Sequence, residues 1–215
     1  MIMTHSDEQG LVLPPTVAPE QVVIVPIWQA DTKEAVLDYA ADLADDLDDA
    51  GVRVELDDRD SRNPGFKYNE WELKGVPVRL EVGPNEVADD EVTAVHRPDG
   101  ETVTLDRDGV DETVRGELDA VYAKLYAAAE ETLDGGIRDA DSRAEILGTI
   151  GQHGGYVRAP WCGEEACETE IKDQIAAEIA MVPFPEDDDH HPESDADCAV
   201  CGESATRTAY YAKTY

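Results

Sequence analysis

Apolar and polar positions along the chain alternate in runs that predict strands and helices in turn. Residues 21–27 form a mainly apolar run that predicts a buried strand. Asp31 and Thr32 then predict the cap of an amphipathic helix that ends before Gly51. The same reasoning places strands at 52–56, 76–82, 92–96 and 101–105, and helices at 68–73 and 110–133. Strands that alternate with helices and then form an antiparallel hairpin indicate an α/β layer with a mixed sheet.

A break at Asp134-Gly135-Gly136 interrupts the last of these helices and predicts a domain boundary. We therefore expect a first domain at 21–134 and a second at 137–215. Within the second domain the pattern predicts a helix at 168–180. The segment 186–197 is strongly acidic and is expected to form a disordered loop.

Composition adds an acidic surface to this picture. The chain has 17 Lys and Arg against 50 Asp and Glu, a formal charge of -33, yet 41% of its 215 residues are apolar, which indicates a folded protein. Repulsion among the carboxylates opposes the compact state, and about 1 M salt shortens the Debye length to roughly 3 Å. The composition therefore indicates a salt-loaded cytoplasm and a haloarchaeal source. The many aspartates of the amphipathic helix that ends before Gly51 are then expected to be solvated surface.

The sequence carries no signal that would direct it out of the cytoplasm. No apolar run approaches the roughly 20 residues that span a bilayer, and the N-terminus has no secretory pattern. We therefore expect a cytoplasmic protein without a membrane partner. In a reducing compartment, closely spaced cysteines point to metal more than to disulfides.

The four cysteines form two close pairs with C-x4-C and C-x2-C spacing. Four thiolates suit tetrahedral Zn²⁺, and short spacings let two turns close on one ion. The sequence therefore predicts a structural zinc site at Cys162, Cys167, Cys198 and Cys201. Disulfides or spare thiols are the alternatives. His190 and His191 lie close to the second pair in the sequence, but we expect them to be exposed to solvent because the thiol set is complete without them.

Basic residues gather in one part of the first domain. Six of the 17 lie within 27 residues, namely Arg53, Arg59, Arg62, Lys67, Lys74 and Arg79. One interpretation is salt bridging to neighbouring carboxylates. The other is that cations and carboxylates together read the bases of an RNA loop, because unpaired guanine offers acceptors to Arg or Lys and donors to Asp or Glu. We expect the Pro64-Gly65 turn to present Lys67 outward, and Arg79 and Glu81 to share one strand face.

Three stretches carry a resemblance to a known family. Residues 63–84, from Asn63-Pro64-Gly65 to Gly83-Pro84, resemble the anticodon-domain signature of archaeal and eukaryotic-type prolyl-tRNA synthetases. Residues 1–27 resemble the passage from the third class II motif into that domain, and the aromatic ending at 209–215 resembles the family's C-terminus. The resemblance implies a class II synthetase anticodon-binding domain, with a mixed sheet flanked by helices, followed by a small zinc-binding α/β domain.

The resemblance also implies a function for each part. Residues 1–20 would be the end of the catalytic domain and a linker, and the basic region would recognise tRNA(Pro). The residues expected to bind RNA are Arg59, Lys67, Glu70, Lys74, Arg79 and Glu81. ATP and Mg²⁺ would act only in the full-length enzyme, a homodimer whose catalytic motifs are missing upstream of this chain. We therefore expect the chain alone to be inactive in attaching proline to tRNA.

Two other functions remain as alternatives. One is a free-standing tRNA-binding or regulatory protein derived from the synthetase. The other is an independent zinc hydrolase, which would need fewer than four thiols on the metal and His153 as general base.

Overall fold

The structure is a computed structural model that describes residues 4–184 and 196–213. The chain divides into two compact units, at 1–128 and 129–215. Most of the expected acidic loop lies outside the described residues, and so do both His190 and His191. No helix in the described part of the chain is long and apolar enough to cross a membrane.

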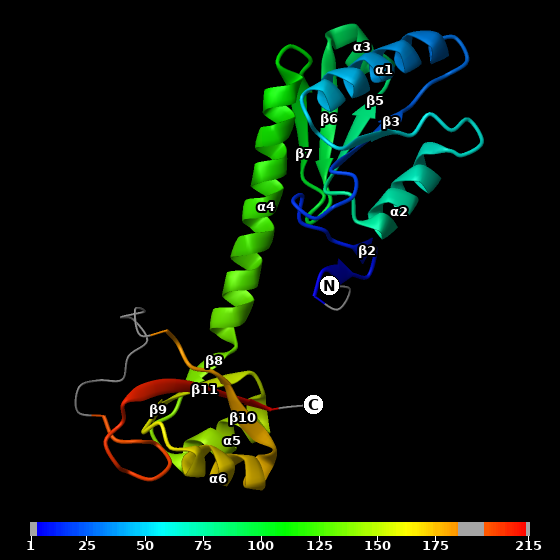
Figure 1. The fold of residues 1–215 in the computed structure, drawn as a ribbon. Helices are drawn as coiled ribbons and strands as arrows, with labels where there is room; N and C mark the ends of the chain where they lie inside the picture. Colours follow the sequence, from blue (N-terminus) through cyan, green and yellow to red (C-terminus); the bar gives the residue numbers. More distant parts are fainter. Residues whose placement is uncertain (1–3, 185–195, 214–215) are drawn as a thin grey trace. The chain divides into compact units, whose positions relative to one another are not determined.

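The first unit contains a five-stranded mixed sheet (Figure 1). Its strand order is β4 (Val54–Leu56), β3 (Val22–Pro26), β5 (Val78–Val82), β6 (Glu91–His96) and β7 (Thr102–Asp106). β3 runs parallel to β4 and β5, whereas β6 and β7 are antiparallel to their neighbours. The helices are α1 (Lys33–Asp49), α2 (Pro64–Lys74), α3 (Pro84–Asp89) and most of α4 (Val110–Gly135), whose last residues belong to the second unit. The predicted mixed α/β fold is confirmed.

Successive side chains of β3 point to opposite faces of the sheet, so the core of this unit has two layers. Val22 and Ile24 pack with buried residues of α1 and α4 on one face of the sheet. Val23 and Val25 face the other way and pack against Trp71 of α2. Because every residue of β3 is buried, the strand reads in sequence as the continuous apolar run typical of a central parallel strand.

A short hairpin precedes this sheet. It pairs β1 (Ser6–Asp7) with β2 (Gly10–Leu11) and lies against the end of α2. A Cβ on Gly10 would lie 2.4 Å from the Cα of Leu73, and a Cβ on Gly75 would lie 2.6 Å from the Cβ of Leu11. Both glycines also have positive φ angles, so each position favours glycine for two reasons.

The second unit is a four-stranded sheet with two helices. In sheet order the strands are β10 (Ala177–Met181), β11 (Arg207–Lys213), β9 (Tyr156–Trp161) and β8 (Ile137–Asp139), and the helices are α5 (Arg143–His153) and α6 (Glu165–Ile175). β10 pairs with β11 and β11 pairs with β9 in antiparallel orientation, whereas β8 and β9 are parallel. Ile146, Ile171, Val157 and Tyr211 meet in its core.

Two local predictions are wrong in part. The helix expected at 168–180 ends at Ile175, because Ala176 adopts a left-handed conformation (φ 53°) and the following residues pair with β11 as strand β10. Thr32 is the N-cap of α1 as predicted, but its side chain makes no capping hydrogen bond and instead accepts one from the Gln29 N–H at 3.0 Å. The short helices α3 and α5 were not predicted.

Candidate nucleic-acid interface and thiol cluster

A groove of about 730 Å³ lies over the face of β5 and β6. Its floor includes Arg79 and Glu81 of β5 and Thr93 and Val95 of β6. Its walls come from the end of α2, the β6–β7 turn and the N-terminal hairpin, with Glu72, Arg97, Asp99, Asp7, Glu8 and Gln9 among the lining residues. The groove therefore combines cations, carboxylates and an amide over a hydrogen-bonded sheet.

Arg79 is held between two carboxylates on the floor of this groove. Its Nε donates to the Glu81 Oε1 at 3.0 Å, and its Nη1 donates to the Glu72 Oε1 at 3.1 Å. The guanidinium carbon also lies 4.0 Å from the ring centroid of Tyr68, so the ring orients the cation as well. Arg79 and Glu81 therefore share one strand face, as expected, and form an ion pair with each other.

Asp57 organises the polar contacts on the other side of α2. Its carboxylate accepts hydrogen bonds from Arg59 Nε at 2.8 Å, Arg59 Nη2 at 2.7 Å and Trp71 Nε1 at 2.8 Å. Burial by itself raises the pKa of Asp57, but the hydrogen bonds from Arg59 and Trp71 and the charge of Lys67 outweigh burial and lower the pKa to about 2. The carboxylate is therefore ionised at neutral pH although only 2% of Asp57 is exposed.

Lys67 is buried, and the expectation that it points outward is wrong. Only 1% of the residue is exposed, and its Nζ donates to the Asp57 carbonyl oxygen at 2.7 Å. The turn at Pro64-Gly65 starts α2 instead of forming a free loop, and the helix directs Lys67 inward toward Asp57 and the ring of Trp28. Burial also lowers the pKa of Lys67.

The remaining predicted RNA-binding residues of α2 form ion pairs on its surface. Glu70 accepts from Arg59 at 3.0 Å and lies 3.4 Å from the Lys74 Nζ. Lys74 in turn lies 3.7 Å from the ring centroid of Trp71, which is buried. The salt-bridged interpretation therefore describes this cluster, while a role in RNA binding stays a prediction. Of the six residues, only Arg79 and Glu81 line the groove.

Two polar features near the groove were missed in the sequence. Arg97 is 8% exposed, and its Nη1 and Nη2 donate to the Asp7 carboxylate at 2.8 and 2.6 Å. His96 is 2% exposed and lies 2.8 Å from the Glu117 Oε2 through Nε2 and 3.3 Å from the Lys124 Nζ through Nδ1. An ammonium only donates, so Nδ1 accepts and Nε2 carries the proton. Residues this far apart in sequence leave no local signal.

The four cysteines converge in the second unit. Their sulfur atoms all lie within 4.8 Å of one another, with Cys162 Sγ 3.6 Å from Cys167 Sγ and 3.8 Å from Cys201 Sγ. A tetrahedral ion with Zn–S bonds of about 2.3 Å requires sulfur separations of about 3.8 Å. The cluster therefore fits a tetrahedral metal ion, and all four cysteines are free thiols rather than disulfides.

The turn around the second cysteine pair favours the thiolate form of Cys198. Burial raises the pKa of the Cys198 thiol, but backbone N–H groups of Cys201 and Val200 outweigh burial and lower the pKa to about 7. Cys167 lies in the first turn of α6, and burial raises the pKa of its thiol. His153 is exposed at the end of α5 and does not belong to the thiol cluster, whose described members are four cysteines.

Tyr211 is the neighbouring polar group in this core. The residue is 0% exposed, and within the described part of the chain its hydroxyl has no hydrogen-bond partner. Burial raises the pKa of Tyr211, and the charges that the Cys198 and Cys167 side chains can carry raise it further.

Comparison with known proteins agrees with this arrangement. Residues 21–117 match the anticodon binding domain family, and residues 143–215 match the C-terminal domain family of prolyl-tRNA synthetase. The proline–tRNA ligases of Halorubrum lacusprofundi and Haloarcula marismortui are 70% and 68% identical over the whole chain, and that of Thermococcus kodakarensis is 43% identical. In each case the chain spans 44% of the relative's length.

The mixed sheet with its flanking helices is thus the anticodon-binding domain of a class II synthetase. The unit that carries the thiol cluster follows it in sequence. The chain carries the anticodon-binding and C-terminal domains of the prolyl-tRNA synthetase family.

Proposed function

We propose that this chain recognises the anticodon of tRNA(Pro) for a proline–tRNA ligase. The observation that carries the proposal is the groove over β5 and β6, whose floor lies inside the part of the chain that matches the anticodon binding domain family. The alternative of a free-standing tRNA-binding protein is not favoured, because relatives named proline–tRNA ligase match the whole chain.

The chemistry of the groove suits guanine bases. A guanidinium donates to guanine O6 and N7, and a carboxylate accepts from its N1 and N2 groups, so Arg79 and Glu81 together offer both kinds of contact. In the free chain these two side chains pair with each other at 3.0 Å. Binding would exchange this partly exposed pair for contacts with the base.

The chemical step would belong to the rest of the ligase. The family implies that ATP and Mg²⁺ activate proline to prolyl-adenylate before its transfer to tRNA, in a homodimer. This chain would contribute recognition, and the first 20 residues would lead from the catalytic domain into the anticodon-binding domain. The boundaries 21–134 and 137–215 remain our proposal for the two domains.

We further propose that the thiol cluster holds a structural Zn²⁺. Cys162, Cys167, Cys198 and Cys201 supply four sulfur ligands at separations that fit a tetrahedral ion. A full set of four thiolates leaves no open position for water, so the ion would stabilise the second unit and take no part in hydrolysis.

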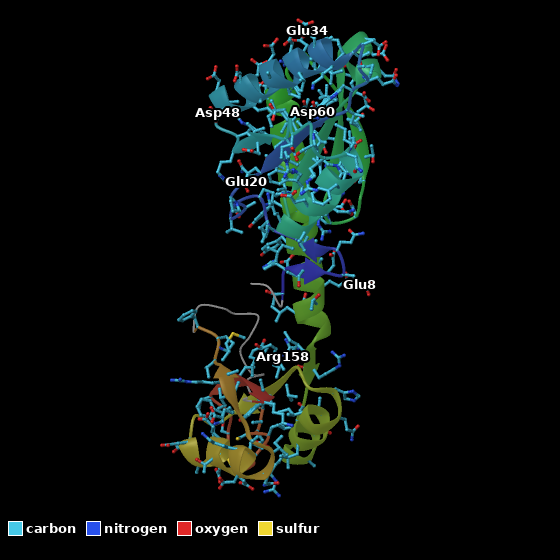
Figure 2. All side chains as sticks on the ribbon, turned by 90° about the vertical axis from the view of Figure 1, so that its right-hand side faces the viewer. Glu8, Glu20, Glu34, Asp48, Asp60 and Arg158 are labelled. Atoms are coloured by element: carbon cyan, nitrogen blue, oxygen red, sulfur yellow. The ribbon has the colours of Figure 1, made fainter. Side chains whose placement is uncertain are left out.

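Binding of an anticodon stem-loop tests the proposed function. We expect the purified chain in 2 M KCl to bind a fluorescent tRNA(Pro) anticodon stem-loop and to bind a loop with inosine in place of guanine more weakly, because inosine lacks the N2 donor. Glu81→Gln should reduce the ratio of affinities for the guanine and inosine loops by about 10-fold, which is the order of magnitude of one bidentate base contact. Glu34→Gln, on the exposed side of α1 in Figure 2, is the matched control. Equal affinity for both loops in the wild type would refute guanine recognition.

A further inference from the structure

The N-terminal hairpin contributes a wall to the groove. Asp7, Glu8 and Gln9 line it together with residues of β5 and β6, although they lie outside the segment that matches the anticodon binding domain family. The hairpin belongs to the same compact unit as the sheet. Glu8 is labelled on the hairpin in Figure 2.

Asp7 fixes this hairpin in place. Its Oδ1 accepts from the backbone N–H groups of Gln9 at 2.8 Å and Gly10 at 3.1 Å, which closes the turn. The same carboxylate binds Arg97 through two hydrogen bonds, and Arg97 Nε also donates to the Glu72 carbonyl oxygen at 3.2 Å. Hydrogen bonds from Arg97 and the two backbone groups hold the pKa of Asp7 well below its usual range. The hairpin is therefore anchored to the turn after β6 by a charge-assisted bidentate pair.

Close packing at two glycines, one in the hairpin and one at the end of α2, adds a steric constraint. Gly10 leaves room for the backbone of Leu73, and Gly75 leaves room for Leu11. Neither close approach would tolerate a side chain, so the hairpin has one seat against the end of α2. The tip residues, Glu8 and Gln9, are therefore held over the groove by a rigid support.

The side chains at the tip are available for a ligand. Glu8 and Gln9 are exposed, and in the described ranges 4–184 and 196–213 no side-chain hydrogen bond or ion pair is found for either. A carboxylate repels phosphate but accepts hydrogen bonds from the N1 and N2 groups of guanine or N4 of cytosine. A glutamine amide both donates and accepts, so it reads a base edge of either kind.

We propose that Glu8 and Gln9 contact bases of the anticodon loop and act as specificity-determining residues. This inference rests on the proposed function of the groove. It extends the base-reading surface beyond the matched domain, to a hairpin that precedes it in the chain. The ligand is a single-stranded loop whose bases present donor groups to Glu8, and not a phosphate or an acidic peptide.

The sign of a charge-removing substitution tests the proposal. On a chain of formal charge -33, removing one carboxylate without a contact should leave RNA binding unchanged or strengthen it slightly. We expect Glu8→Gln to weaken binding of the tRNA(Pro) anticodon stem-loop by about 10-fold, the order of one base contact. Gln9→Ala should weaken it by about 5-fold, and Glu34→Gln, which removes the same charge from α1, should not weaken it.

Each outcome separates the two proposals. If the wild type binds the stem-loop and Glu8→Gln binds it equally well or more tightly, this inference is overturned and the proposed function of the groove is unaffected. Wild-type failure to bind the stem-loop would overturn both. Because Glu8 and Gln9 are exposed at a turn, circular dichroism and the thermal unfolding midpoint should match the wild type, and binding differences then report contact.

Discussion

Replacing Asp57 with Asn should destabilise the first unit by about 2 to 3 kcal/mol at neutral pH. The substitution keeps the shape and one acceptor oxygen, so Trp71 retains a partner. It places an amide group against Arg59 and removes the negative charge that faces the buried ammonium of Lys67 at 3.7 Å. The loss therefore comes from charge and not from packing.

The magnitude follows from the pKa of Asp57. Its pKa falls from 3.8 to about 2, and each unit corresponds to about 1.36 kcal/mol, which gives about 2.4 kcal/mol of stability for the ionised form. Arg59 is 40% exposed, so salt screens part of its contribution. Leaving Lys67 buried without a carboxylate adds a cost, since breaking a buried pair typically costs about 3 to 5 kcal/mol. These opposing corrections keep the expectation near 2 to 3 kcal/mol.

The pH dependence distinguishes this cause from a packing defect. A carboxyl with a depressed folded-state pKa contributes its stability fully above the unfolded value, about pH 4, and loses it as the pH falls toward 2. Urea unfolding of wild type and Asp57→Asn in 2 M KCl should therefore differ by a constant amount from pH 5 to 7. The difference should shrink between pH 4 and 2. A difference below about 0.5 kcal/mol at pH 7, or one that does not change with pH, would refute the reasoning.

Three further substitutions test other parts of the structure. Cys198→Ser should lower zinc content, measured by metal analysis of protein purified without chelators, and leave unfolding of the first unit unchanged; zinc near zero in the wild type would remove the zinc proposal. Tyr211→Phe should stabilise the zinc-free chain by about 1 kcal/mol in urea unfolding, because it removes a buried hydroxyl without a partner in the described residues, whereas Tyr210→Phe should not stabilise it. Gly75→Ala should cost about 1 to 3 kcal/mol by the same assay, because φ is 76° and Leu11 lies 2.6 Å from the new Cβ; an unchanged midpoint would contradict this.

Strand and helix periodicity could be predicted because the signal is local. The buried run at β3, the glycine that ends α2 and the hairpin of β6 and β7 each depend on neighbouring residues. The failure at 168–180 has the opposite cause. Residues 177–181 become a strand because β11 offers a paired edge, and a partner about 30 residues away leaves no mark on the local pattern.

The two candidate sites differ in how much the sequence indicated. Cysteine chemistry is specific, so two close pairs predicted one cluster, and the structure brings all four sulfurs together. Charged residues are not a specific signal for a binding site, because the sequence pattern around a helical lysine is the same whether the lysine faces solvent or a buried carboxylate. Lys67 faces Asp57, and only the tertiary structure decides this. Likewise, the pair of Asp7 and Arg97 joins residues 90 positions apart.

An acidic chain that binds RNA must rely on base contacts. Glu34 and Asp48 lie on the exposed side of α1, in a surface whose charge repels phosphate (Figure 2). The cations of the groove, Arg79 and Arg97, are already paired with carboxylates and have little charge left to attract a backbone. At molar salt the phosphate attraction is screened for any protein, so an interface that depends on it would fail. In the proposed role, mixed pairs such as Arg79 and Glu81 would avoid this dependence, because hydrogen bonds to a base edge act at contact distance, where salt screens little.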